Sequence, residues 1–468
     1  MDGSKASTIA DMLGGLKHRA AAGILIDGPA KLHGVVDVQG SKNAALKIIP
    51  ALAAFPRVFR LRRVPVIIDT LELLSALASL GAEVRPGAEA DEFLVDSRTV
   101  GARHLPAEIT RRTTTAFYFA GALLGRFGSV RIGDPGGDEI GLRAIDLHLS
   151  GFRALGGRIS GRDGCLNIIL PADASRDTVS LALPSAGATV NVALAGLRNP
   201  AGVTIERSPV DADMAAFWDC LQRSGAWVHR DGDAVSCRLD RAAAASGDGP
   251  IELSCPADRN DAFTWLAVGA LSEQGVLVRR LDVAELRPAV EVLAQLGGLI
   301  EEGADGSSLS VLRPGGGLSA PRTAVIAGPS PGFHSDWAPL LQPVLATAHG
   351  RSRTIDVLHS NRVRQADVLR AMGAKVTVSG GQPPPGLEVR FPAGLDDARY
   401  VVDIDGPAAL HGAAVDVGND VRACAAAVVA GTVAVGVTTI SDAHALYRGY
   451  EDFLGRLARL GARVAPLR

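Results

Sequence analysis

The sequence repeats one short pattern six times, and this repeat limits the folds that the chain can adopt. Each copy is an amphipathic stretch ending in a leucine-like residue, followed by glycine, a small residue, any residue and a β-branched or aromatic residue. Apolar residues at i, i+3, i+4 and i+7 predict a helix with one buried face, and glycine is typical of the left-handed position that ends a helix. A strand is expected to begin directly afterwards. The six glycines are Gly81, Gly156, Gly225, Gly297, Gly373 and Gly461.

The spacing of these glycines, 75, 69, 72, 76 and 88 residues, predicts units of mixed helix and strand. Strand-like runs precede most copies, as at residues 58–64 and 275–281. The period is too long for a solenoid repeat, whose units are about 20–50 residues. The sequence also lacks the glycine-rich motifs of Rossmann and P-loop nucleotide sites. We therefore expect two pseudo-threefold α/β domains, each built from three units.

Composition excludes several classes of function. The 468 residues include 48 Lys and Arg against 50 Asp and Glu, and this balance argues against a nucleic-acid partner. The five cysteines are scattered, which indicates neither a metal site nor a disulfide framework and favours a reduced cytoplasmic protein. Residues 1–23 lack the apolar core of a secretory signal. The apolar run at residues 423–437 is too short to span a bilayer and predicts a buried helix leading into a strand, so no membrane partner is expected.

Charged residues interrupt apolar or glycine-rich sequence at six places. Lys42 lies at an expected helix start, where a cation opposes the helix dipole; it is either a solvated surface lysine or part of an anion site with the backbone N–H groups. Residues 133–143 contain four glycines and a proline among three acids, which is typical of a lid or of an acidic hairpin tip.

The other four places also lie at expected element ends. Asp258 or Asn260 is expected to cap a helix, and so is Ser335 or Asp336. Cations distributed over different units could together bind a small, multiply charged anion, since arginine matches phosphate and carboxylate with paired hydrogen bonds. Two acids near them could donate and accept a proton. The cations are Lys42, Arg143, Arg362, Arg422 and Arg448, and the acids are Asp138 and Asp336.

The motifs GSKNAALKIIPALAA, ADRNDAFTWLAVGAL, GFHSDWAPL and SNRVRQADVLRAMGA resemble those of the UDP-N-acetylglucosamine enolpyruvyl transferase family, and the resemblance extends from about residue 24 to residue 464. It implies an α/β fold of two inverse α/β barrel domains with the active site in the interdomain cleft. Residues 24–41 and 258–468 would form one domain, and residues 42–257, with a catalytic loop at 133–143, the other. Residues 1–23 would be an extension.

The resemblance also implies a reaction. The family transfers the enolpyruvyl group of phosphoenolpyruvate to a sugar hydroxyl and releases phosphate, with no cofactor, no metal and no obligate protein partner. Matching motifs give Lys42, Arg143 and Arg448 to the phosphate, Arg422 to the carboxylate and Asp336 to the acceptor hydroxyl as the base. Asp138 would be the acid. Further positions on the uridine nucleotide would be Asn43, Ala144, Ile145, Asp146, Leu147, Ser185, Ala186, Gly187 and Arg362, with Asp69, Arg259 and Asp420 elsewhere in the cleft.

Asp138 departs from the usual family pattern, which has a cysteine at this loop position. A carboxylic acid can donate the same proton if burial or the neighbouring Asp134 and Glu139 raise its pKa. Because none of the five cysteines lies in this loop, the protein is predicted to be insensitive to epoxide antibiotics of the fosfomycin type, which alkylate that thiol.

Other departures affect the acceptor. Thr114 and Leu183 stand where the family has cations near the diphosphate, His359 replaces a phenylalanine, and an acidic stretch is shortened at residues 205–209. These losses favour a smaller acceptor, the ribose 3′-hydroxyl of UMP, as in relatives from nucleoside-antibiotic pathways. UDP-N-acetylglucosamine, the cell-wall substrate, remains the alternative. A catalytically silent paralogue that binds a nucleotide is the third possibility, and the retained base and cations argue against it.

Overall fold

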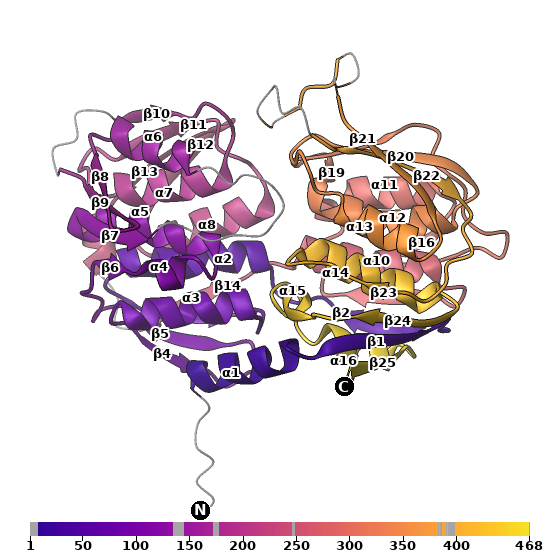
Figure 1. Ribbon diagram of the computed structural model, residues 1–468. Coiled ribbons are helices and arrows are strands. Elements are labelled where there is room, and N and C mark those ends of the chain that lie inside the picture. Colours follow the sequence, from indigo (N-terminus) through magenta and orange to yellow (C-terminus); the bar gives the residue numbers. More distant parts are fainter. Residues whose placement is uncertain are drawn as a thin grey trace, which may run out of the picture. The chain divides into compact units, whose positions relative to one another are not determined.

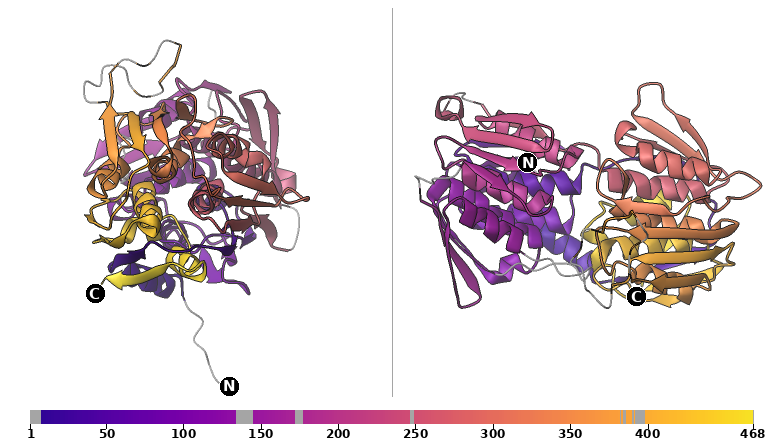
Figure 2. Two further views of the ribbon diagram at one scale, coloured as in Figure 1. Left: turned by 90° about the vertical axis from the view of Figure 1, so that its right-hand side faces the viewer. Right: turned by 90° about the horizontal axis from the view of Figure 1, so that it is seen from above.

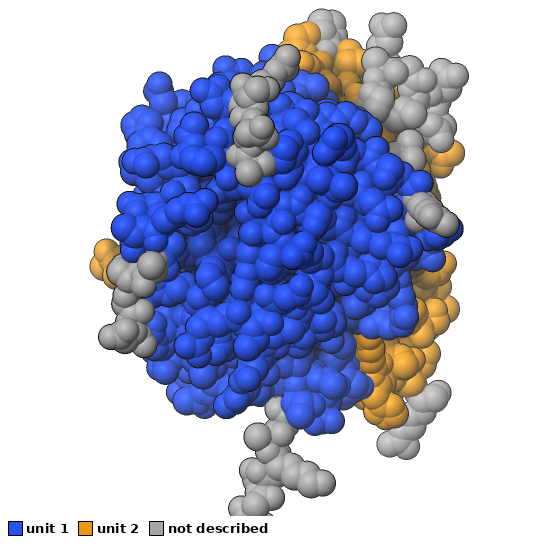
Figure 3. Space-filling model, turned by 90° about the vertical axis from the view of Figure 1, so that its left-hand side faces the viewer, with its two compact units in different colours: residues 1–15, 40–137, 142–256 blue, residues 16–39, 138–141, 257–468 orange. Residues whose placement is uncertain are grey.

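The computed structural model describes residues 8–133, 145–171, 177–245, 249–381, 383, 386–389, 391 and 398–467. The chain divides into two compact units (Figure 1, Figure 3). Among described residues, unit 1 contains 8–15, 40–133 and 145–256, and unit 2 contains 16–39 and 257–467. After residues 8–15 of unit 1, the chain forms two strands of unit 2, returns to unit 1 at Gly40 and re-enters unit 2 at Ala257.

Unit 1 has three four-stranded sheets, each served by its own helices. The strand order of the first sheet is β14 (Ile251–Ser254), β3 (Val58–Arg62), β5 (Phe93–Asp96), β4 (Glu83–Pro86). The strand order of the second sheet is β6 (His104–Leu105), β7 (Ser129–Gly133), β9 (Cys165–Ile169), β8 (Arg158–Arg162). The strand order of the third sheet is β10 (Thr178–Ser180), β11 (Val203–Glu206), β13 (Ala234–Leu239), β12 (Ala226–Asp231). The helices are α2 (Lys42–Ala51), η1 (Leu52–Ala54), α3 (Ile68–Ser79), α4 (Ala107–Thr110), η2 (Thr114–Phe117), α5 (Tyr118–Phe127), α6 (Asp146–Ala154), α7 (Ala186–Gly196), α8 (Ala212–Arg223) and α9 (Arg241–Ala245).

Unit 2 repeats this plan with one five-stranded sheet. Its sheets are β16 (Leu299–Glu302), β17 (Ser308–Leu312), β15 (Val276–Arg279), β2 (Gly34–Asp37); β19 (Phe333–His334), β18 (Val325–Gly328), β20 (Gly350–Asp356), β22 (Val401–Gly406), β21 (Lys375–Ser379); and β23 (Ala414–Val415), β24 (Gly436–Ile440), β1 (Gly23–Gly28), β25 (Arg463–Leu467). Its helices are α10 (Arg259–Leu271), η3 (Ala284–Leu286), α11 (Arg287–Gln295), η4 (Ser335–Trp337), α12 (Ala338–Thr347), α13 (Arg364–Ala371), α14 (Val421–Val433), α15 (His444–Tyr447) and α16 (Phe453–Arg459).

Three helices run through the middle of each unit and the sheets lie outside them (Figure 1, Figure 2). The inner helices are α2, α5 and α7 in unit 1 and α10, α12 and α14 in unit 2, and within each unit they contact one another. Such helices must be apolar on every side, and α10 is buried along its whole length. This is the inverse α/β barrel: helices form the core, and the sheets cover them. The expected fold class is confirmed.

The glycine repeat is confirmed at all six positions. Each glycine follows a helix (α3, α6, α8, α11, α13 or α16) and has a positive φ between 85° and 108°. A side chain is strained there, which explains why glycine recurs. A strand follows each helix within a few residues, and the apolar run at 423–437 forms most of α14 and the start of β24, as predicted.

The ends of the chain meet in one sheet of unit 2. Strand β1 lies antiparallel between β24 and β25, so that Ile26 is paired with both Thr438 and Val464. Before β1, helix α1 (Ile9–Ala20) buries Ile9 and Leu13 at helical spacing. No helix in the described part of the chain is long and apolar enough to cross a membrane.

Candidate active site

The Asp336 carboxylate, whose side chain is 16% exposed, is the centre of a charged cluster in unit 2. Its Oδ1 lies 2.7 Å from Nη1 of Arg362, and its Oδ2 lies 3.1 Å from Nη2 of Arg422. The Nδ2 of Asn260 donates a further hydrogen bond to Oδ2 at 3.0 Å. The side chains of Arg362 and Arg422 are only 6% and 8% exposed, so water screens these charges weakly. Three donors from three different repeats thus hold one carboxylate.

Asn260, Asp336 and Arg422 lie at the N-termini of the inner helices of unit 2, and Arg362 directly precedes α13. Helix α10 is capped by Asp258, which accepts hydrogen bonds from the backbone N–H groups of Asn260 and Asp261, so the predicted cap is confirmed. Helix α14 is capped in the same way by Asp420, which accepts from two backbone N–H groups. The caps place Asn260 and Arg422 in the first turns, where side chains point back toward the helix start.

The ionisation of Asp336 follows from its neighbours. Burial alone would raise the pKa of this carboxyl, but the charges of Arg422 and Arg362 outweigh burial and hold the pKa well below its usual range. Asp336 is therefore a carboxylate at neutral pH and is excluded as a proton donor. An anion held by two guanidinium groups is also a weak base. It can accept a proton efficiently only after at least one of these arginines has turned to another anion.

Neither Ser335 nor Asp336 caps a helix, so that prediction was wrong. The cap of η4 is His334, whose Nδ1 accepts from the backbone N–H of Asp336 at 3.3 Å. Ser335 instead donates to Oδ2 of Asp356 at 2.6 Å, and its Oγ lies 2.8 Å from Nδ1 of His359. Because Ser335 is buried beside the carboxylate that ends β20, this charge-assisted bond replaces the cap.

The other two predicted cations of unit 2, Arg259 and Arg448, are also buried and have partners. Nη1 of Arg259 lies 3.4 Å from Glu285, and its Nη2 lies 3.4 Å from Nε2 of His334. Nη1 of Arg448 donates to Oδ1 of Asn419 at 3.1 Å. Buried guanidinium groups held this way are ordered before any ligand arrives.

In unit 1, Lys42 is buried rather than a solvated surface lysine. Its Nζ lies 2.8 Å from Oδ2 of Asp69. Helix α2 begins at Lys42 and is capped by Ser41, which accepts from the backbone N–H of Ala44 at 3.2 Å and donates to Oδ1 of Asp213 at 2.6 Å. Asn43, the next residue, is half-buried. The structure therefore places Lys42 and Asp69, both sequence-predicted, in direct contact.

Three of the predicted nucleotide residues of unit 1, Ser185, Ala186 and Gly187, lie at the start of α7. Ser185 caps this helix, and a Cβ on Gly187 would come within 2.9 Å of the Tyr118 hydroxyl and 3.0 Å of the His148 ring. Those two rings stack with centroids 6.1 Å apart. The Oδ1 of Asn191 accepts a hydrogen bond from the backbone N–H of Gly121, which fixes the orientation of the amide. The Nδ2 of Asn191 therefore donates to Nδ1 of His148 at 2.8 Å. The glycine thus leaves room for two aromatic side chains that the sequence reading missed.

The predicted uracil-binding stretch lies only partly within the described residues. Ile145, Asp146 and Leu147 lie at the start of α6, next to His148. Burial lowers the pKa of His148 to about 4, against the opposing effect of Asp146, so its ring is neutral at pH 7. Asp138, Arg143 and Ala144, together with residues 134–137 and 139–142 of the predicted catalytic loop, lie outside the described residues.

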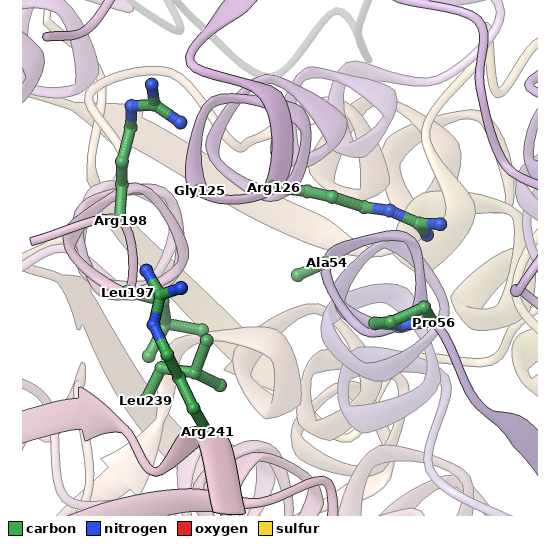
Figure 4. A pocket seen from close by; sticks show the side chains of 8 residues that line it. All are labelled: Ala54, Pro56, Gly125, Arg126, Leu197, Arg198, Leu239 and Arg241. Atoms are coloured by element: carbon green, nitrogen blue, oxygen red, sulfur yellow. The ribbon is translucent and has the colours of Figure 1, made fainter. Parts of the chain in front are cut away.

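A cavity of about 230 Å³ in unit 1 is lined by three arginines but does not resemble an anion site (Figure 4). Arg126 donates from Nη1 to the carbonyls of Ala53 and Ser97, and Nε of Arg198 donates to the carbonyl of Leu170. The guanidinium groups point in different directions, and Arg241 is exposed. Backbone carbonyls therefore take up the charge of two of the three arginines.

Several polar residues of the cluster were not predicted. They are Asn260 as a ligand of Asp336, the Ser335–Asp356–His359 network, and Tyr450, whose hydroxyl accepts from Nη1 of Arg422 at 2.9 Å. Asn260 and Tyr450 each lie within a few residues of a predicted arginine, so sequence proximity was a usable signal. Asp356 ends β20 a few residues before His359 and Arg362, so its position in the sequence was a usable signal as well.

Comparison with known proteins places this chain among enolpyruvyl transferases. Residues 26–457 match the family described as EPSP synthase (3-phosphoshikimate 1-carboxyvinyltransferase). UDP-N-acetylglucosamine 1-carboxyvinyltransferase 2 of Carboxydothermus hydrogenoformans is 32% identical over 441 residues, 94% of this chain and 98% of that protein. The enzyme of the same name from Lactococcus lactis is 30% identical over 444 residues, again 94% and 98%.

Solved structures agree on the fold. The enolpyruvyl transferase NikO from Streptomyces tendae superposes with a TM-score of 0.78 at 21% identity, covering 95% of this chain and 98% of NikO. EPSP synthase from Acinetobacter baumannii gives 0.68 at 17% identity, covering 95% of this chain and 100% of that enzyme. The family match and the sequence relatives show that the chain belongs to the EPSP synthase family of enolpyruvyl (1-carboxyvinyl) transferases.

Proposed function

We propose that this protein transfers the enolpyruvyl group of phosphoenolpyruvate to the ribose 3′-hydroxyl of UMP and releases phosphate. The observation that carries this proposal is Asp336, an ionised carboxylate held between Arg362 and Arg422. An addition–elimination reaction needs a base at the acceptor hydroxyl and fixed cations for the anionic donor. This cluster offers both in one place.

The proposed roles balance the reaction. In the addition step Asp138 protonates the methylene carbon, the acceptor oxygen bonds to C2, and Asp336 takes the hydroxyl proton. In the elimination step the new methyl group loses a proton, the double bond re-forms and the phosphate leaves. Lys42, Arg143 and Arg448 would bind the phosphate, and Arg422 the carboxylate. The roles of Asp138 and Arg143 rest on the resemblance of the sequence motifs.

Because Arg422 is paired with Asp336, the binding of phosphoenolpyruvate to Arg422 would also change the ionisation of Asp336. The carboxylate of phosphoenolpyruvate would compete with Asp336 for the same guanidinium group, at 3.1 Å in the free protein. Arg422 pairing with the substrate would leave Asp336 with one arginine fewer, and the pKa of Asp336 would rise toward the range of a working base. Asp336 would thus become an effective base only once phosphoenolpyruvate is bound.

Two features support a UMP-type acceptor. Leu183, which is 46% exposed, and Thr114, which is half-buried, stand at positions where the motif resemblance implies cations for a diphosphate. His359 brings a polar ring close to Ser335, beside Asp336, at a position where the resemblance implies a phenylalanine. UDP-N-acetylglucosamine is the second candidate, favoured by the names of the sequence relatives.

A phosphate-release assay tests the proposal. Purified protein is given phosphoenolpyruvate with UMP, UDP or UDP-N-acetylglucosamine, and release is expected with UMP. Release only with UDP-N-acetylglucosamine would remove the UMP assignment, and no release with any acceptor would favour a silent nucleotide-binding protein. Asp138→Asn should abolish turnover and leave acceptor binding unchanged; persisting turnover would assign the proton donor elsewhere.

A further inference from the structure

The hydrogen bonds among Ser335, Asp356 and His359 determine which nitrogen of His359 carries a proton. The Asp356 carboxylate is buried and accepts from the backbone N–H groups of Leu358 and His359 at 2.8 and 3.1 Å. Neighbouring charges and hydrogen bonds, led by His359, lower the pKa of Asp356 despite its burial. An ionised carboxylate can only accept hydrogen bonds, so the Ser335 hydroxyl at 2.6 Å must donate its single proton to it.

The Oγ of Ser335 is then an acceptor toward every other partner. It lies 2.8 Å from Nδ1 of His359 and 3.4 Å from Nη1 of Arg362. Arginine always donates, and Nδ1 must donate too because the hydroxyl proton is already used. His359 therefore carries its hydrogen on Nδ1. In the neutral ring this leaves the lone pair on Nε2.

The Nε2 edge of the ring faces away from the network. Nδ1 is directed at Ser335 and Asp356, which are both buried, whereas the His359 side chain is 25% exposed. The exposed part must be the opposite edge, which contains Nε2. No residue in the described part of the chain forms a hydrogen bond with this nitrogen. It is a hydrogen-bond acceptor held in place without a partner.

The His359 ring is linked to the proposed base through Ser335 and Arg362. Nη1 of Arg362 lies 3.4 Å from Oγ of Ser335, which contacts His359, and 2.7 Å from Oδ1 of Asp336. The other groups around Asp336 are mainly donors: two arginines and the amide of Asn260, whose Oδ1 is buried. A hydroxyl adjacent to the attacking hydroxyl would find its acceptor in Nε2.

We propose that His359 is a specificity residue that recognises a vicinal diol in the acceptor. Asp336 takes the proton of the attacking hydroxyl, and Nε2 of His359 accepts a hydrogen bond from the neighbouring hydroxyl. For a ribose 3′-hydroxyl acceptor this neighbour is the 2′-hydroxyl. The inference rests on the proposed function for the identity of the acceptor, and it adds the residue that discriminates a ribonucleotide from its 2′-deoxy analogue.

Two variants of similar shape separate the hydrogen bond of Nδ1 to Ser335 from the proposed hydrogen bond of Nε2 to the acceptor. In His359→Gln the side-chain amide reaches the position of Nε2, where its oxygen can still accept. In His359→Asn the amide occupies the position of Nδ1, so the bond to Ser335 is kept and the outer acceptor is lost. The wild type should bind and use UMP at least about 100-fold better than 2′-deoxyUMP, since a site built for a hydroxyl rejects its absence strongly. The preference should largely survive in His359→Gln and fall to within about threefold in His359→Asn.

Calorimetric binding of UMP and 2′-deoxyUMP is measured in parallel with phosphate release, so the inference and the proposed function fail differently. Equal binding of both nucleotides by the wild type, or an undiminished preference in His359→Asn, would overturn the inference whether or not turnover is observed. Absence of turnover with every acceptor, with the binding preference intact, would overturn the proposed reaction and support the role of His359.

Discussion

The two units share one architecture but differ in chemistry at the ends of their inner helices. In unit 1, hydroxyl groups cap α2 and α7 through Ser41 and Ser185. In unit 2, carboxylates cap α10 and α14 through Asp258 and Asp420. A hydroxyl cap leaves the positive end of the helix dipole available to an anion, whereas a carboxylate cap cancels much of it. Unit 2 must therefore supply positive charge by side chains, and Arg362 and Arg422 do so.

The opposite ends of the helices differ as well. In unit 1, Arg126 lies in the last turn of α5 and donates to the carbonyl of Ala53, which lies in η1. In unit 2, carbonyls near the ends of α12 and α14, at Ala346 and Thr432, accept backbone N–H groups from Ala408 and Ala30. Carbonyl groups near helix ends thus accept hydrogen bonds from a side chain in unit 1 and from backbone N–H groups in unit 2. The repeat sets the scaffold, and the residues at its ends set the chemistry.

The largest effect is expected where unit 2 loses its central charge. Asp336→Asn should lower kcat by about 10²- to 10⁴-fold, because the amide cannot take the hydroxyl proton. Phosphoenolpyruvate binding should be retained or tightened, since Arg422 loses its competing carboxylate. Steady-state kinetics and calorimetry measure the two effects. Asp416→Asn, an exposed acid of the same unit, is the control, and equal losses in both variants would refute the assignment.

The buried ion pair between Asp261 and Arg456 tests how unit 2 stabilises charge in its core. Nη1 and Nη2 of Arg456 bind the two carboxylate oxygens at 2.8 and 2.9 Å, and Trp265 donates to the same group at 3.0 Å. Asp261→Ala should lower the free energy of unfolding by about 3–5 kcal/mol, because an unpaired buried guanidinium remains. The exposed pair of Asp27 and Arg463 is the control, with a loss below about 1 kcal/mol for Asp27→Asn in denaturant titrations. Similar losses in both variants would contradict the prediction.

The two units should respond to acid in different pH windows. The pKa of His148 in unit 1 is lowered from 6.5 to about 4, so the folded state binds fewer protons there, and stability is lost as pH falls from about 6.5 to 4. The loss should reach about 2–3 kcal/mol and be absent in His148→Gln. The depressed pKa of Asp336 in unit 2 contributes stability that is lost only below about pH 4. Denaturation at pH 7, 5.5 and 4.5 compares wild type with His148→Gln, and parallel curves would exclude His148.

A smaller effect is expected at the hydroxyl cap of unit 1. Ser41→Ala removes the hydrogen bonds to Ala44 and Asp213 and should lower the free energy of unfolding by about 1–2 kcal/mol. Thermal and chemical denaturation give the value. Ser150→Ala, in the exposed face of α6, should change stability by less than about 0.5 kcal/mol. If Ser41→Ala lowers the free energy of unfolding no more than Ser150→Ala does, the Ser41 hydroxyl does not stabilise the N-terminus of α2.

No effect at all is expected from fosfomycin. The five cysteines are buried, and burial raises the pKa of Cys220, Cys237, Cys255 and Cys424 to about 12, so these four are thiols at neutral pH. Intact mass spectrometry after incubation should show unmodified protein and full activity. An adduct on residues 133–143 would contradict the assignment of Asp138 as the proton donor. A family enzyme with a cysteine in this loop is the positive control.

Local sequence predicted the repeated elements well because their determinants are local. The left-handed turn that Gly81 or Gly373 adopts is a property of a few residues, and so is the cap that Asp258 provides. Lys42 was ambiguous for the opposite reason. Whether a lysine is solvated or paired depends on Asp69, which comes from the next helix of the unit.

The sequence by itself determined the number and kind of repeats, the glycine-terminated helix ends and the absence of a cysteine from residues 133–143, since each depends on neighbours along the chain. Only the tertiary structure decided what the charged groups contact. Arg362 and Arg422 meet at Asp336 because the turn before α13 and the start of α14 both lie next to it, and Ser335 binds Asp356 rather than capping a helix because β20 ends beside it. Charge and hydrogen-bond partners are set by distances between residues far apart in sequence. These distances make Asp336 an ionised carboxylate and assign the proton of His359 to Nδ1.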